Sequence, residues 1–144
     1  METRVNILQT QPEAYKAMAG LEKYLASTPL TPKHKELIKI RASQINGCAY
    51  CINMHTRDAR KIGETEQRIY LLNAWRETTL YTEEEQVILA MTEEVTLIQH
   101  HLSDATYESA RKLFDKKYIA AILMMIVTIN AWNRIAIATK MPID

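Results

Sequence analysis

Cys48 and Cys51, the only two cysteines of this 144-residue chain, lie three positions apart, and His55 follows four positions after the second. If the segment after Gly47 is helical, residues three and four positions apart are surface neighbours, so both thiols and the imidazole share one stripe. A thiol at a helix N-terminus is shifted toward the thiolate, and a histidine one turn beyond it is a base within reach. This spacing predicts a dithiol that attacks a substrate and then closes to a disulfide.

Glu36 is a further candidate whose position depends on how the chain folds. On one continuous helix it would lie about 18 Å from Cys48, at ~1.5 Å per residue, and could take no part in thiol chemistry. The Asn46-Gly47 pair is a helix breaker, which allows two helices to fold back on each other. Such a hairpin can return Glu36 or Arg41 toward the cysteines, and spacing alone does not decide this contact.

The elements that must position these residues are predicted to be helices. Only 3 glycines and 4 prolines occur in 144 residues, too few for the turns of an all-β fold. Gly47 and Gly63 bracket the segment that carries the cysteines and His55. From apolar spacing and capping residues, we expect an all-α fold with helices over residues 11–26, 31–45, 48–62, 65–76, 82–98, 104–114 and 118–139.

Net charge and the lengths of the apolar segments argue against nucleic-acid binding and membrane insertion. A net charge of +1 gives no basic surplus for nucleic acid or an anionic membrane surface. The N-terminus has no apolar signal segment, and the longest apolar stretch, Ile119–Ile129, is about half of the ~20 residues that a membrane span needs. We therefore expect a single domain over 1–144 in the cytoplasm, where a close cysteine pair is redox-active or metal-binding rather than a structural staple.

Several spaced positions together resemble a known motif. Glu36, Ser43, the Cys48-Ala-Tyr-Cys51 run and His55 look like the core motif of the AhpD-like alkylhydroperoxidases, within the carboxymuconolactone decarboxylase superfamily. Asn130-Ala131-Trp132-Asn133-Arg134 is similar to a segment in that family's last helix. The resemblance spans most of residues 31–139.

This resemblance implies a helical bundle of about six to seven helices that assembles into homo-oligomers, trimers or hexamers. It also implies an antioxidant thiol peroxidase without metal or cofactor. Cys51 would reduce hydrogen peroxide or a small organic hydroperoxide and become a sulfenic acid, and Cys48 would resolve it to the disulfide. His55 and Glu36 would form a proton relay, and a dithiol reductant such as a lipoyl-bearing protein would restore the thiols.

Three other functions compete with this one. The pair could be a non-catalytic dithiol sensor, or Cys48, Cys51 and His55 could bind zinc with a fourth ligand among the remaining histidines, His34, His100 and His101. The decarboxylases of the superfamily lack the cysteine pair, which argues against that activity.

Other side chains receive structural interpretations. Ser43 either hydrogen-bonds near the thiols or fills a tight helix crossing, and Tyr50 is expected to form a pocket wall. Arg134 is expected to pair with a glutamate if it is buried. Thr82 and Glu85 are expected to form a capping box, and the run 83–85 of glutamates suits the positive end of a helix dipole rather than a metal.

Overall fold

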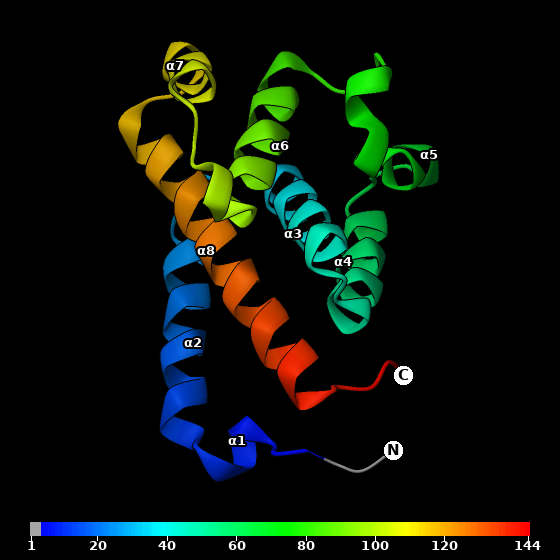
Figure 1. The fold of residues 1–144 in the computed structure, drawn as a ribbon, viewed down its shortest axis with the longest axis vertical. Coiled ribbons are helices and arrows are strands. Elements are labelled where there is room, and N and C mark those ends of the chain that lie inside the picture. The colour runs from blue at the N-terminus through cyan, green and yellow to red at the C-terminus, as the bar shows by residue number, and fades with distance from the viewer. Residues whose placement is uncertain (1–3) are drawn as a thin grey trace.

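The computed structural model describes residues 4–144, and every regular element in this range is a helix (Figure 1). The elements in chain order are α1 (Ile7–Thr10), α2 (Pro12–Ala26), α3 (Pro32–Asn46), α4 (Ala49–Lys61), α5 (Glu66–Tyr70), the 3-10 helix η1 (Leu72–Glu77), α6 (Glu83–Thr96), the 3-10 helix η2 (Ile98–His100), α7 (Asp104–Leu113) and α8 (Lys116–Thr139). The all-α prediction is confirmed. Two short elements that the apolar spacing did not indicate, α1 and η2, are added to the expected set.

The helix expected over residues 65–76 is the main error in the predicted boundaries. The chain instead forms α5 and then η1, in which Ala74 leaves the helical region with φ −120° and ψ 27°. In a 3-10 turn, residues three apart eclipse each other. Leu72 and Trp75 therefore face the same way, and both are buried in a core cluster with Leu37 and Leu89.

Helix α8 forms the centre of the bundle. Figure 1 shows it crossing the molecule diagonally between α2 on one side and α3 and α6 on the other. Its fully buried side chains, Ile122, Met125, Ile126 and Ile129, pack with residues of α3 and α6 in the largest core cluster. This central position accounts for the nearly uniform apolar sequence of the helix between Ile119 and Ile129.

By length and composition alone, α8 could also cross a membrane, because its 24 residues continue beyond the apolar stretch that ends at Ile129. Half of its most apolar 18-residue window is buried inside the fold. The core helix of a globular bundle is buried and apolar in the same way, so burial inside the fold accounts for the apolar composition of α8.

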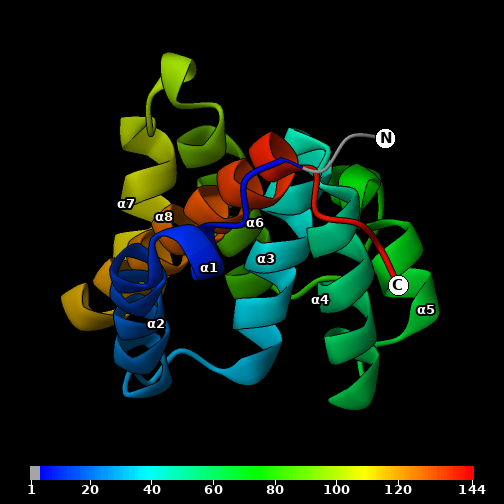
Figure 2. The ribbon, with the colours of Figure 1, turned by 90° about the horizontal axis from the view of Figure 1, so that it is seen from below.

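Helices α3 and α4 form a tight hairpin, and α3 lies between α2 and α4 (Figure 2). Thr31 caps α3 by accepting a hydrogen bond from the backbone of His34, and Pro32 occupies its first turn. Gly47 ends α3 in the left-handed conformation at φ +71°, where a side chain is disfavoured. The next residue, Cys48, already caps α4, so the chain reverses within two residues.

Candidate active site

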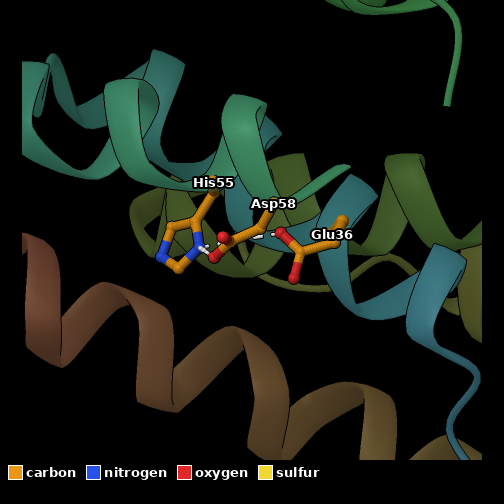
Figure 3. A group of neighbouring side chains, drawn as sticks. All are labelled: Glu36, His55 and Asp58. Carbon is orange, nitrogen blue, oxygen red and sulfur yellow. Dashed lines mark ion pairs between the residues drawn. The ribbon is translucent and has the colours of Figure 1, made fainter. Parts of the chain in front are cut away.

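The hairpin brings Glu36 to His55, which decides the contact that spacing left open. Oε2 of Glu36, in the second turn of α3, lies 3.6 Å from Nδ1 of His55 on α4 (Figure 3). Arg41, the other residue that the hairpin could have returned, points elsewhere and pairs with Glu93 of α6 at 2.8 Å. Although twelve positions separate Glu36 from Cys48 in the chain, Glu36 therefore contacts α4, the helix that carries the cysteines.

Cys48 and Cys51 form a disulfide within the first turn of α4, with their Cα atoms 5.3 Å apart. That separation is within the range that a disulfide spans without backbone movement. Both residues are buried, and Sγ of Cys48 accepts a hydrogen bond from the backbone N–H of Cys51 at 3.3 Å. The predicted conversion between dithiol and disulfide is thus compatible with this local geometry.

A pocket of about 340 Å³ opens onto this turn of α4. Among the described residues, Cys51 lines the pocket, whereas Cys48 does not. Tyr50 lines it too, as expected, and the wall is largely apolar and aromatic, with contributions from Tyr15, Met54, Met125, Ile129, Trp132, Ala136 and Met141. A molecule that enters from this side meets the second cysteine first.

The pocket wall also carries polar side chains, those of Lys39, His55, Asp58 and Glu22. The indole N–H of Trp132 donates to Oε1 of Glu22 at 2.8 Å. Asp58 also approaches Nδ1 of His55, with its Oδ2 at 3.7 Å. Figure 3 shows the ring held with Nδ1 toward both carboxylates and its other nitrogen turned away from them.

Glu36 is an ionised carboxylate in this arrangement. Burial raises the pKa of its carboxyl, but the adjacent His55 and the ammonium of Lys39 outweigh burial and leave the pKa below its ordinary value. Nζ of Lys39 lies 3.3 Å from Oε1 of Glu36. One oxygen of the carboxylate is therefore paired with Lys39 and the other faces the imidazole.

A network of polar side chains joins the turn between α3 and α4 to α8. The amide of Asn46, the last residue of α3, donates to the side-chain oxygens of Asn130 and Asn133, each at 2.9 Å. Asn133 is completely buried and donates to the hydroxyl of Ser43 at 3.0 Å. The backbone carbonyl of Ser43 accepts from the N–H of Cys48. Ser43 is thus joined to α8 through its hydroxyl and to Cys48 through its backbone carbonyl.

The structure also places the other side chains that received structural interpretations. Arg134 is exposed and donates to Asn130. Because its side chain faces solvent, the condition for a buried ion pair does not hold. Glu85 of the 83–85 run completes a capping box with Thr82, as predicted, but it is also buried against Arg68.

The zinc site weighed as an alternative, with both cysteines as ligands, is not assembled among the described residues. Both sulfurs are joined to each other, and Nδ1 of His34 lies 2.6 Å from the hydroxyl of Tyr118, at the start of α3. Asp58 was missed by sequence reasoning, although its place three residues after His55 on one helix puts the two side chains on the same face.

An all-helical bundle that seats a cysteine pair at the first turn of a helix, on an apolar pocket and next to a glutamate–histidine pair, defines an AhpD-like protein. The sequence agrees, because residues 12–94 match the Carboxymuconolactone decarboxylase family. The chain belongs to this family.

Relatives and solved structures extend the similarity beyond the matched segment. YdfG of Bacillus subtilis, an uncharacterised protein, is 46% identical over 139 residues, which are 96% of this chain and 95% of YdfG. A protein of unknown function from Agrobacterium tumefaciens, described as a candidate antioxidant defence protein AhpD, has a TM-score of 0.94 at 40% identity over 99% of both chains.

The debrominase Bmp8 shares the fold as well, with a TM-score of 0.84 at 20% identity over 95% of this chain and 74% of Bmp8. Because a debrominase adopts this fold, the fold by itself does not define the reaction.

Proposed function

We propose that this protein is a thiol peroxidase that reduces hydrogen peroxide or small organic hydroperoxides through Cys51, with Cys48 as the resolving thiol. The observation that carries the proposal is the unequal exposure of the two cysteines to the pocket: Cys51 lines it and Cys48 lies behind it. A hydroperoxide in the pocket can reach Cys51, and Cys48 is close enough to displace what Cys51 forms.

The proposed cycle has three steps. The Cys51 thiolate attacks the distal oxygen of the hydroperoxide, the O–O bond breaks, and the alcohol or water leaves after taking a proton. The resulting Cys51 sulfenic acid is attacked by the Cys48 thiol, its S–O bond breaks, and water leaves as the disulfide forms. A dithiol reductant then reduces the disulfide by thiol–disulfide exchange and is itself oxidised.

His55 and Glu36 are assigned the proton transfers. A neutral imidazole carries one proton, and the hydrogen-bond partner of one nitrogen sets the role of the other. With Nδ1 directed at Glu36 and Asp58, the proton is favoured on Nδ1. The second nitrogen is then free to accept the proton of the reacting thiol and to return it to the leaving oxygen.

Further parts of the proposal concern the setting of the enzyme. We place it in the cytoplasm, where thiols are kept reduced, with a lipoyl-bearing protein as one candidate reductant. Assembly into a trimer or hexamer is supported by apolar side chains that α8 leaves exposed, Val127 at 49% and Ile137 at 44%. Such residues suit a subunit interface.

Mass spectrometry after peroxide addition tests the chemistry. We expect a Cys51 sulfenic acid in a Cys48→Ser variant and a Cys48–Cys51 disulfide in the unmodified protein. Cys51→Ser should abolish turnover. If pre-reduced protein shows neither product, the proposal is wrong.

Turnover distinguishes this enzyme from a dithiol sensor. With excess dithiol, an enzyme consumes many equivalents of peroxide, whereas a sensor is oxidised once. Reduced lipoamide compared with other dithiols addresses the reductant in the same assay.

A further inference from the structure

Three metal-ligating atoms converge at the α3–α4 hairpin, and they are not the donors that the sequence suggested. A carboxylate oxygen of Glu36, a ring nitrogen of His55 and a carboxylate oxygen of Asp58 all lie within 4.8 Å of one another. We propose that these three side chains bind a divalent transition cation, for which Zn²⁺ is the probe, and that the bound cation inhibits the thiol chemistry.

Burial supports a ligand at this point. Oε2 of Glu36 and Nδ1 of His55 are both buried, and neither has a hydrogen-bond partner among the described residues. Buried polar atoms are normally paired, and an unpaired one costs about 1–3 kcal/mol. Two such atoms that face each other across 3.6 Å are satisfied together by one cation.

The distances fit zinc coordination. For bonds of about 2.1 Å, ligand atoms around tetrahedral zinc lie roughly 3.4 Å apart. The contacts of Nδ1 with Glu36 and Asp58, 3.6 and 3.7 Å, are close to this value. The layout also follows a rule of helical bundles, in which a histidine and a carboxylate three positions apart on one helix face a carboxylate from another helix.

The donor set and its surroundings favour a cation of this type. One imidazole and two carboxylates suit zinc and its neighbours in the first transition row. Lys39 contacts the other oxygen of Glu36 and so orients the carboxylate, the kind of outer contact that supports metal ligands. Asp58 lines the pocket and its side chain is 42% exposed, which gives the cation a route from solvent.

Bound zinc would act on the tautomer of His55; this consequence rests on the proposed peroxidase function. Coordination requires the lone pair of Nδ1, so the Nδ1 proton must leave, and the neutral ring then carries its proton on Nε2. That nitrogen becomes a donor, and the ring can no longer accept a proton from the thiol. Zinc therefore inhibits by reversing the roles of the two nitrogens.

Binding is tested on the disulfide form, in which the sulfurs are not available as thiolate ligands. Tag-free oxidised protein is titrated with ZnCl₂ in a calorimeter. We expect one zinc per chain and at least tenfold weaker binding in Asp58→Asn and His55→Gln, since loss of even an outer contact costs 10–100-fold. The matched controls Asp104→Asn and His100→Gln change exposed residues and should bind as the unmodified protein does.

Circular dichroism establishes that each variant is folded. The inference is overturned if the folded oxidised protein takes up no zinc, or if Asp58→Asn and His55→Gln bind zinc as tightly as the controls.

Inhibition is measured separately, as the rate of a single oxidation of pre-reduced protein by peroxide without added dithiol. We expect zinc to slow this rate, EDTA to restore it, and Asp58→Asn to require at least tenfold more zinc for half-inhibition. An unchanged zinc requirement in Asp58→Asn would place the inhibitory zinc on the thiols and overturn the regulatory part. If zinc binds the oxidised protein but peroxide never oxidises the reduced one, the metal site stands and the proposed function fails.

Discussion

Two clusters in this bundle each place two carboxylates around one basic side chain, yet they differ in how completely their polar atoms are paired. In the Arg68 cluster, the guanidinium contacts Glu64 at 2.7 Å and Glu85 at 2.5 Å. Backbone N–H groups of Thr65 and Thr82 also donate to these carboxylates. In the His55 cluster, formed by Glu36, His55 and Asp58, the corresponding contacts are 3.6 and 3.7 Å.

This difference in pairing distinguishes the roles of the two clusters. The Arg68 cluster is saturated: Glu64 and Glu85 are 3% exposed, and the always-charged guanidinium holds α5 against the start of α6. The His55 cluster keeps two buried polar atoms, Oε2 of Glu36 and Nδ1 of His55, without hydrogen-bond partners among the described residues. The first stabilises the fold, and the second has unused capacity for protons or a cation.

Removing Arg68, the cation of the fully paired cluster, should have the largest effect on the stability of the fold. Arg68→Ala leaves two buried carboxylates without their cation, and breaking such a pair costs about 3–5 kcal/mol. Urea unfolding at pH 7 measures this loss in the free energy of unfolding. Arg111→Ala, which removes a surface contact to Glu108, is the control and should leave stability nearly unchanged. Equal losses in the two variants would contradict the assignment of the Arg68 cluster as structural.

Removing His55, the base of the incompletely paired cluster, should instead lower the rate of the reaction. His55→Gln is expected to lower the rate of peroxide reduction about 10²–10⁴-fold, the usual contribution of a general base. The same variant should unfold at nearly the urea concentration of the unmodified protein, because no short hydrogen bond is lost. Stopped-flow thiol oxidation and urea unfolding provide the two readouts, and a large loss of stability with retained activity would reverse the comparison.

The smallest expected effect is the pH dependence of stability that Glu36 contributes. Its pKa in the fold lies below the ordinary value of 4.5, so the unfolded chain binds its proton more readily. The stabilisation is therefore complete above about pH 4.5 and is lost as the pH falls through the folded pKa. In Glu36→Gln, the stability deficit relative to the unmodified protein should shrink as urea unfolding is moved from pH 6 to pH 3.5. A deficit that grows toward acid pH would mean that the carboxyl is protonated in the fold.

The sequence was most informative where local rules decide the structure. The helix break at Asn46-Gly47, Cys48 at the start of α4 and the Thr82 capping box are consequences of neighbouring residues, and all three were predicted. The stripe of Cys48, Cys51 and His55 follows from helical spacing in the same way.

The features that local sequence rules do not predict depend on how the helices pack. Whether Glu36 or Arg41 faces α4 is set by the rotation of α3 against its neighbours, which no local signal contains. The split between α5 and η1 follows from the burial of Leu72 and Trp75 against α3 and α6, and it overrides the helical pattern of the segment. The three asparagines that tie the hairpin to α8 meet only in the folded bundle.

Both cysteines lie in the first turn of α4, which limits how far the chain must move when the disulfide forms or opens. The covalent bond joins residues already brought together by the winding of α4, whose backbone bond from Ile52 to Cys48 is intact in the oxidised form. The disulfide therefore needs no other segment of the chain to be brought in, and it is compatible with an intact first turn of α4.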